Sequence, residues 1–179
     1  MDRTGMIHLY IGNGKGKTTA AAGLAIRALG RDYKVFFAQF LKTSDTGEKN
    51  ILEKCFGEKL LFFRPVQRHG KFLWNMTEKE LLETKEDIMN GWRIIAAELH
   101  SGKYDIVILD EILDCIQCGL LESNEVLSDI IKRPANVEVV CTGRDAPAAF
   151  YEASDYITKM CSLKHPYDRG IKARYGIEY

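Results

Sequence analysis

Residues 6–29 read MIHLYIGNGKGKTTAAAGLAIRAL, an apolar run, a glycine-rich stretch and an alanine-rich run in immediate succession. The apolar residues 6–11 end at Gly12 and predict a short β-strand. Residues 18–29 combine alanine, the strongest helix former, with leucine and isoleucine, and Gly30 ends the run, so they predict an α-helix. A strand and a helix joined by glycines, lysines and threonines are typical of a loop that binds phosphate.

The glycine-rich stretch, residues 12–19, has the residue types that the triphosphate of a nucleotide requires. Glycines let the backbone wrap closely around an anion with several N–H groups aimed at it, and the following helix adds its positive end. Lys17 would bring a full charge to the β- and γ-phosphates, and the Thr18 hydroxyl could bind Mg²⁺. The usual pattern, GxxxxGK[ST], has its first glycine where this chain has Ile11. The loop is therefore one residue short, and it carries an additional cation, Lys15.

Apolar strands and helical segments alternate along the rest of the chain. Thr77 and Glu80 form a capping box at the start of the longest helix, and Asp145 is expected to cap the last one. Continuous apolar strands predict a mostly parallel central sheet with helices on both faces, an α/β fold of the P-loop NTPase-like (RecA-like) class. No composition break divides residues 1–179, which are expected to form a single domain. The predicted strands are residues 34–40, 59–63, 105–109, 137–141 and 156–161, and the predicted helices are residues 47–56, 77–100, 111–118, 123–132 and 145–153.

An acidic pair, Asp110-Glu111, directly follows the apolar residues 105–109. Ligands of parallel sheets bind at the carboxyl ends of the strands, so the pair is expected beside the loop. Mg²⁺ prefers oxygen ligands, and one or two carboxylates beside Thr18 would be enough to hold it. The alternative is that Asp110 caps the following helix. The sequence therefore predicts that at least one carboxylate of the pair helps to hold a metal.

The composition excludes several classes of partner. Of the 179 residues, 25 are Lys or Arg and 25 are Asp or Glu, so the chain has no overall field to attract nucleic acid or an anionic membrane. No apolar run reaches the length of a membrane span and the first residues lack a signal-peptide pattern, so a cytoplasmic location is expected. The five cysteines are an odd number, which argues against a disulfide framework. Cys115 and Cys118 form a CxxC that could bind a metal, but a pair of small core or boundary residues is the favoured interpretation.

The residues alone indicate a nucleotide-triphosphate-binding α/β protein, because no local pattern identifies the base or orienting group that a kinase needs. The chain also resembles a known family, the bacterial P-loop-type cob(I)alamin (corrinoid) adenosyltransferases. The resemblance rests first on the short, doubly cationic loop GNGKGKTTAA at residues 12–21. It extends over nearly the whole chain through Arg27, Gln39-Phe40, residues 47–50, Leu109-Asp110-Glu111, Thr142-Gly143-Arg144, Lys164-His165, Gly170, Lys172-Ala173 and residues 176–179.

The resemblance implies that the 5′-deoxyadenosyl group of ATP is transferred to Co(I) of a reduced corrinoid, giving adenosylcobalamin, adenosylcobinamide or adenosylcobyrinate diamide and inorganic triphosphate. Co(I) is itself the nucleophile, so no protein base is required. The leaving triphosphate needs cations and N–H donors, which Lys15, Lys17, the loop amides and Mg²⁺ (or Mn²⁺) would supply. The resemblance also implies a homodimer and an electron-donating flavoprotein as partner.

The same resemblance implies roles for individual residues. Phe72 and Trp74 match a Phe-x-Trp pair at the corrinoid, where apolar rings would displace the lower axial ligand of Co(II) and make the metal easier to reduce. The alternative for these two rings is ordinary anchoring of a loop in the core. The implied metal ligands are Thr18, Glu111 and Asp110. The implied ATP-binding residues are Gly12, Asn13, Gly14, Lys15, Gly16, Lys17, Thr18, Thr19 and Arg27.

Two features depart from the family pattern. Only five residues precede the first predicted strand, where family members often have a longer segment that covers the site. Lys71 stands where a small residue is expected, and residues 64–70 are not typical. Two other functions remain open: an ATPase or small-molecule kinase that shares the loop, and a nucleotide- or corrinoid-binding protein without turnover.

Overall fold

The structure, a computed structural model, describes residues 4–42, 44–66 and 73–178. Its centre is a six-stranded sheet in the order β3-β2-β4-β5-β1-β6, and every pair of neighbouring strands is parallel. The strands are β1 (Ile7–Ile11), β2 (Val35–Gln39), β3 (Leu60–Phe63), β4 (Ile106–Asp110), β5 (Glu138–Thr142) and β6 (Tyr156–Lys159). The predicted α/β class is confirmed, and the sheet is entirely parallel.

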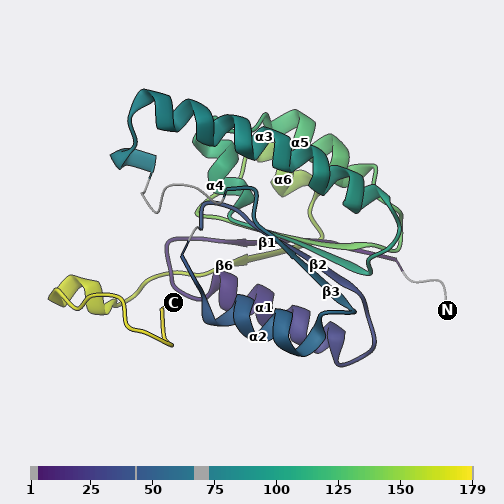
Figure 1. Ribbon diagram of the computed structural model, residues 1–179, viewed down its shortest axis with the longest axis horizontal. Coiled ribbons are helices and arrows are strands. Elements are labelled where there is room, and N and C mark those ends of the chain that lie inside the picture. Colours follow the sequence, from purple (N-terminus) through teal and green to yellow (C-terminus); the bar gives the residue numbers. More distant parts are fainter. Residues whose placement is uncertain (1–3, 43, 67–72, 179) are drawn as a thin grey trace.

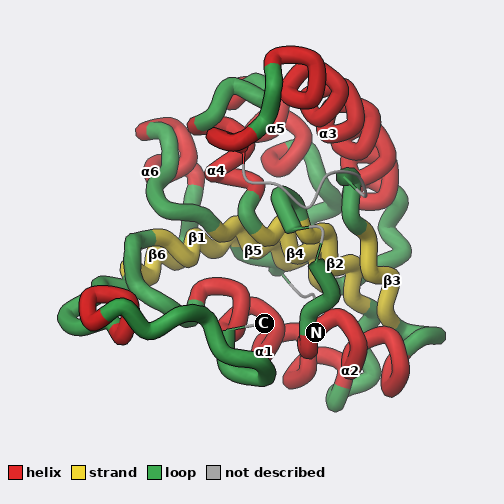
Figure 2. The backbone as a smooth tube through the Cα atoms, turned by 60° about the vertical axis from the view of Figure 1, so that its left-hand side comes forward, coloured by secondary structure: helices red, strands yellow, loops and turns green. Residues whose placement is uncertain are grey.

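Helices cover both faces of this sheet (Figure 1). One face carries α1 and α2, and the other carries α3, α4, α5 and α6, which the rotated view shows equally well (Figure 2). Two buried apolar clusters correspond to the two layers, the larger one under α3 and the smaller one under α1. The helices are α1 (Lys17–Leu29), α2 (Gly47–Phe56), α3 (Glu78–His100), α4 (Ile112–Gln117), α5 (Ser123–Ile131) and α6 (Ala148–Ala153), with short 3₁₀ turns η1 (Leu73–Asn75) and η2 (Pro166–Arg169).

Two predicted helix caps have different outcomes in the structure: the one at the start of α3 is confirmed, and the one at the start of α6 is wrong. The capping box at the start of α3 is present, because the Thr77 side chain accepts from the Glu80 amide while the Glu80 side chain accepts from the Thr77 amide. Asp145 is not the cap of α6, which begins after Pro147. Its carboxylate instead accepts from the Ala146 amide and the Tyr151 hydroxyl.

Among the described residues, no helix is both long and apolar enough to span a membrane.

The strand order decides where the site lies. The strand before the glycine-rich loop, β1, and the strand before the acidic pair, β4, are both paired with β5. Since all six strands are parallel, their carboxyl ends lie at one edge of the sheet, and the loop and the acidic pair face each other there across one intervening strand.

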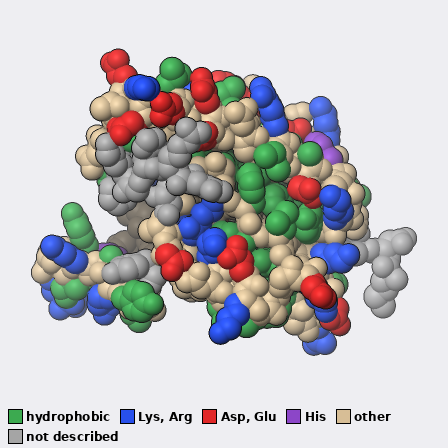
Figure 3. All heavy atoms as spheres, viewed as in Figure 1, with side chains coloured by type: hydrophobic (Ala, Val, Ile, Leu, Met, Phe, Trp, Pro, Cys, Tyr) green, Lys and Arg blue, Asp and Glu red, His purple; other side chains and the backbone are tan. Residues whose placement is uncertain are grey.

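The C-terminal residues 160–178 run away from β6 along the outside of the molecule and stand out from its body (Figures 1 and 3). Large apolar side chains in this segment are exposed, among them Leu163, Tyr167 and Tyr175. The end of the segment nevertheless returns to the glycine-rich loop, as its contacts below show.

Candidate active site

The glycine-rich loop has a backbone that only glycine adopts easily. Gly12 and Gly16 have φ values of 112° and 115°, in the left-handed region that side chains rarely enter. A Cβ atom on Gly12 would lie 2.2 Å from the carbonyl oxygen of Met160, and one on Gly14 would lie 2.8 Å from the same atom. The loop is therefore pressed against the backbone that follows β6. Glycine is required by torsion and space at Gly12, by space at Gly14 and by torsion at Gly16.

The loop ends at the uncapped start of a helix. Gly16 is the N-cap of α1, no side chain caps the helix, and its first turn contains no acidic residue. Two loop amides are already used, because Gly12 donates to the Arg144 carbonyl at 2.9 Å and Gly14 donates to the Met160 carbonyl at 2.8 Å. The amides that begin α1 are thus the ones that could donate to an anion, with the positive end of the helix behind them.

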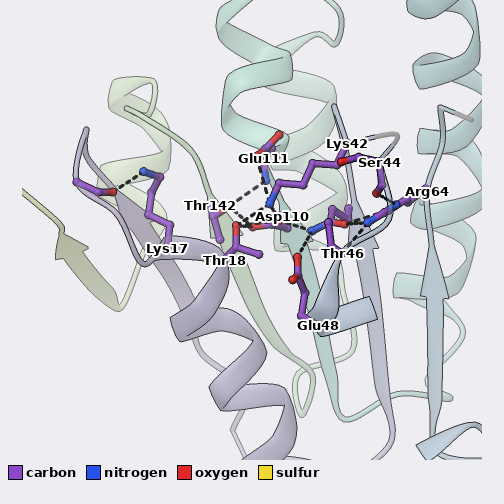
Figure 4. A network of polar contacts seen from close by, with 12 residues as sticks. Lys17, Thr18, Lys42, Ser44, Thr46, Glu48, Arg64, Asp110, Glu111 and Thr142 are labelled. Carbon is purple, nitrogen blue, oxygen red and sulfur yellow. Dashed lines mark hydrogen bonds and ion pairs between the residues drawn. The ribbon is translucent and has the colours of Figure 1, made fainter. Parts of the chain in front are cut away.

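Both loop lysines donate hydrogen bonds to oxygen atoms of the protein itself. The Lys17 ammonium donates to the carbonyl oxygens of Gly12 at 2.7 Å and Gly14 at 3.0 Å, and Figure 4 shows it turned back toward the loop. Burial lowers the pKa of Lys17. The Lys15 ammonium donates to the Ile177 carbonyl at 2.9 Å and to the Glu178 carboxylate at 3.0 Å, both near the C-terminus. Each lysine would have to exchange these partners for phosphate oxygens when a nucleotide binds.

Asp110 is a buried carboxylate at the end of β4 that three side chains hold in place. Its oxygens accept from the Thr18 hydroxyl at 3.0 and 3.1 Å, from Thr142 at 2.7 Å and from the Gln39 amide at 3.0 Å. The helix that follows has Glu111 as its N-cap and no side-chain cap. The alternative that Asp110 caps this helix is therefore wrong. Asp110 instead connects the loop to β5 and β2.

Glu111 and Lys42 complete a ring of polar groups around Thr18 (Figure 4). The Lys42 ammonium lies 3.2 Å from the Thr18 hydroxyl oxygen, 3.7 Å from an Asp110 oxygen and 3.6 Å from a Glu111 oxygen. A cation is thus already surrounded by one hydroxyl and two carboxylates. These hard oxygen donors suit Mg²⁺, and the ammonium stands where a divalent cation would meet them.

The pKa of Glu111 is raised to about 7. Burial is the largest cause, the nearby Lys42 ammonium opposes it, and the carboxylates of Asp110 and Asp114 add to it. A bound divalent cation would favour the ionised form of this carboxyl group.

A second polar chain leads from Asp110 to the end of β3. The Gln39 amide donates to Asp110 and to Glu48, and its oxygen accepts from Arg64. Arg64 also donates to the Ser44 carbonyl at 2.7 Å and to the Thr46 hydroxyl at 2.9 Å. Arg64 therefore fastens the segment between β2 and α2 to β3. Sequence reasoning named Gln39 only as part of the resemblance and missed both Lys42 and Arg64 as contributors.

The structure places the remaining predicted residues as follows. Thr19 lies in the first turn of α1, and the Asn13 side chain accepts from the Ser162 amide at 3.3 Å. Arg27 is an exposed residue in the last turn of α1, ten residues beyond Lys17 and hence about 15 Å along the helix, so the structure does not bring it to the loop. Trp74 lies in η1 with 72% of its surface exposed, whereas Phe72 is outside the described residues.

The two cysteines of the CxxC differ in burial. Cys115 is buried, Cys118 is exposed, and in the described ranges no three His, Cys, Asp or Glu side chains are grouped as metal ligands. Burial raises the pKa of both thiols. Cys115 belongs to the apolar core, as the favoured interpretation predicted.

These features define a P-loop nucleotide-binding protein: a glycine-rich strand–helix loop with a lysine and a threonine, facing a carboxylate at the end of a neighbouring strand of a parallel sheet. Comparison with known proteins identifies the family. Residues 3–179 match the family model described as ATP:corrinoid adenosyltransferase BtuR/CobO/CobP. The chain belongs to this family.

Curated relatives agree with the family model. Over 99% of this chain, the corrinoid adenosyltransferase of Pseudomonas aeruginosa is 36% identical, and the alignment covers 85% of that protein. The Escherichia coli K12 corrinoid adenosyltransferase is 35% identical over 99% of this chain and 87% of its own length. Among solved structures, domain III of the Thermotoga maritima replication initiation protein DnaA is similar with a TM-score of 0.43 and 15% identity, over 88% of this chain and 55% of that one.

The raised pKa of Glu111 predicts how the stability of the metal-free protein changes with pH. The unfolded chain ionises this carboxyl group at its ordinary pKa near 4.5, but the folded protein does so only near 7. The free energy of unfolding should therefore fall as the pH rises from about 4.5 to 7, and the loss should persist above that window. Glu111→Gln should remove the loss and raise the melting temperature at pH 8 by a few degrees, since about 1 kcal/mol shifts a domain of this size by about 2–4 °C.

Thermal unfolding followed by circular dichroism in chelator, at pH 4.5 and at pH 8, measures this effect. Glu152→Gln, at an exposed position of α6, is the matched control and should show no pH-dependent difference from the unmodified protein. An equal effect of Glu111→Gln at both pH values would contradict the prediction.

Proposed function

We propose that this protein transfers the 5′-deoxyadenosyl group of ATP to the cobalt of a reduced corrinoid and releases inorganic triphosphate. The observation that carries the proposal is the family match over residues 3–179, which includes the short loop with its two lysines. The convergence of Thr18, Asp110 and Glu111 beside that loop supports it, because their oxygens could hold a divalent cation. Such a cation would add to the positive charge that a triphosphate needs when it leaves as a unit.

In the proposed reaction, the electron pair of Co(I) attacks C5′ of the ribose and forms a cobalt–carbon bond. The bond between C5′ and the oxygen of the α-phosphate breaks, and its electron pair remains on the departing triphosphate. The nucleophile carries no proton, so the chain has to supply no general base. The task of the site is to hold the triphosphate and to stabilise the charge that develops on its α-phosphate oxygen.

The described residues are suited to this task. Lys17 and Lys15 already form two hydrogen bonds each with protein oxygens, so phosphate oxygens can replace those partners without leaving either ammonium uncompensated. The uncapped first turn of α1 provides backbone donors. Mg²⁺ (or Mn²⁺), held by Thr18 and Glu111, would add Lewis-acid stabilisation of the phosphate charge.

Asp110 supports the site as a positioning group for Thr18. Its carboxylate is fully buried and accepts hydrogen bonds from Thr18, Gln39 and Thr142, which engage both of its oxygens. Glu111 is the better direct ligand, because its carboxylate lies on the open side of the ring beside Lys42. The role of Trp74 at the corrinoid is supported by its exposure, since a ring that anchors a loop in the core would be buried.

Four further parts of the proposal rest on the family resemblance: Mg²⁺ as the metal, an electron-donating flavoprotein, a homodimer and a cytoplasmic location. The roles of Arg27 and Phe72 have the same basis. The competing functions, an ATPase or kinase and a binding protein without turnover, find no specific support in the described site.

The products distinguish the three functions. The protein is incubated anaerobically with ATP, Mg²⁺ and a chemically reduced corrinoid, and in parallel with the analogue in which an imido group replaces the β–γ bridging oxygen. Adenosyl transfer breaks only the C5′–O bond, so both nucleotides should give adenosylated corrinoid, with triphosphate or its imido analogue as the other product. An ATPase or kinase should give ADP from ATP and should stop with the analogue.

ADP together with unchanged corrinoid would overturn the proposal, and tight binding without any product would favour the binding protein.

Lys17→Ala should lose at least tenfold in ATP affinity, measured by calorimetry, because one phosphate-binding charge is removed from a desolvated site. Lys103→Ala, in an exposed ion pair with Glu98, is the matched control.

Replacement of Trp74 tests the corrinoid part of the site. Trp74→Ala should lower the rate with Co(II) corrinoid plus a reductant at least tenfold, because a ring that excludes the lower axial ligand is lost. ATP affinity and melting temperature should remain unchanged, since the side chain is 72% exposed. Trp74→Phe should retain most of the rate. An equal rate for Trp74→Ala and the unmodified protein would show that this ring does not act on the corrinoid.

A further inference from the structure

Lys42 occupies a position that sequence reasoning assigned to a metal ion. Its ammonium lies 3.2 Å from the hydroxyl oxygen of Thr18 and within 3.7 Å of carboxylate oxygens of Asp110 and Glu111. These three side chains are the ones predicted to hold the metal. The close view shows the Lys42 side chain reaching from the end of β2 into the space between Glu111 and Thr18 (Figure 4). The described structure thus contains an internal cation at the cation-binding point.

The backbone on both sides of this point is arranged to bring the charges together. Leu41 and Glu111 have φ values of 51° and 66°, a left-handed conformation that is unfavourable for residues with a side chain. Leu41 is anchored by packing against the larger apolar cluster, and Glu111 is the N-cap of α4. Such strain persists only when the surroundings hold it, and here it occurs where the segments after the neighbouring strands β2 and β4 bring Lys42 within 3.6 Å of Glu111.

The charges at this point favour one cation at a time. Asp110 and Glu111 carry two carboxylates, and the Lys42 ammonium neutralises part of that charge in a largely buried place. A Mg²⁺ ion binds oxygen at about 2.0–2.1 Å, so an ion on Thr18 and Glu111 would come very close to the ammonium. Two cations at such a distance repel each other strongly in a low-dielectric site.

We propose that Lys42 is a built-in counter-ion that keeps free divalent metal out of the site, so that the metal enters only together with the triphosphate. The negative charge of the triphosphate would then draw the ammonium away from Thr18. Lysine is suited to this exchange, because its charge sits on a flexible four-carbon stem and the Lys42 side chain is 26% exposed. The exchange with a nucleotide rests on the proposed function, whereas the exclusion of free metal rests on the geometry of Lys42 alone.

The test is a titration of the nucleotide-free protein with Mn²⁺, in which the electron paramagnetic resonance signal of free Mn²⁺ reports binding. Lys42→Met should bind Mn²⁺ at least tenfold more tightly than the unmodified protein, because the competing charge is gone and both carboxylates remain. Lys42→Arg keeps the charge and should bind as weakly as the unmodified protein. With ATP present, the difference between Lys42→Met and the unmodified protein should shrink to less than threefold.

Two further variants make the result specific. Lys103→Met removes a lysine from an ion pair with Glu98, just beyond the end of α3, and should leave Mn²⁺ affinity unchanged. Thr18→Ala added to Lys42→Met should abolish the gain, which locates the ion. Circular dichroism verifies folding, and Lys42→Gln replaces Lys42→Met if the latter unfolds.

Equal Mn²⁺ affinity of Lys42→Met and Lys103→Met would overturn the proposal, as would a gain that persists without Thr18. The titration contains no corrinoid and requires no turnover. It can therefore fail while adenosylated corrinoid is formed, and it can succeed in a protein that proves to have another activity.

Discussion

The buried carboxylate of Asp110 is the interaction on which the site depends. It accepts hydrogen bonds from Thr18, Thr142 and Gln39, and these belong to the start of α1, the end of β5 and the end of β2. A buried carboxylate without such partners would be costly, so these three segments and β4, which carries Asp110, are held in one arrangement. The parallel sheet makes this possible, because it places the carboxyl ends of all its strands at one edge.

Around this carboxylate, positive charges are kept in place by internal acceptors. Lys17 binds loop carbonyls, Lys15 binds the C-terminal segment, and Lys42 lies between two carboxylates. The whole chain carries equal numbers of basic and acidic residues, so its affinity for a triphosphate has to come from this local concentration. Because the cations are already positioned, a nucleotide that bound to them would exchange their partners without having to order their side chains, which would reduce the cost of binding.

Signals that are local in sequence predicted most of the fold. The loop at residues 12–19, the capping box of Thr77 and the apolar strands each carry their information within a few residues, and the structure confirms them. Asp145 shows the limit of this reasoning. Its carboxylate accepts a hydrogen bond from the Tyr151 hydroxyl and does not cap α6, which begins after Pro147. The convergence of Thr18 with Asp110, 92 positions apart, followed from the rule on strand ends.

The parts of the site that could not be predicted depend on side chains of ordinary surface type. Lys42 follows β2 by three positions, and only the pairing of β2 with β4 brings it to Glu111. Arg64 and the contact between Lys15 and Glu178 likewise join segments whose sequences contain no mutual signal. One general rule would have pointed to Lys42: a cation just past the end of a strand next to the acidic strand lies at the same edge of the sheet.

The central claim is that one edge of the sheet holds the triphosphate on Lys17 and a metal on Thr18 and Glu111, with Asp110 as a positioning group. Anomalous diffraction from crystals grown with Mn²⁺ and the imido analogue of ATP tests this most directly. The account predicts an Mn²⁺ peak in contact with the Thr18 hydroxyl and a Glu111 oxygen, phosphate oxygens on Lys17, and Asp110 still bonded to Gln39 and Thr142. A peak coordinated directly by Asp110 without Thr18, or a triphosphate bound away from Lys17, would contradict it.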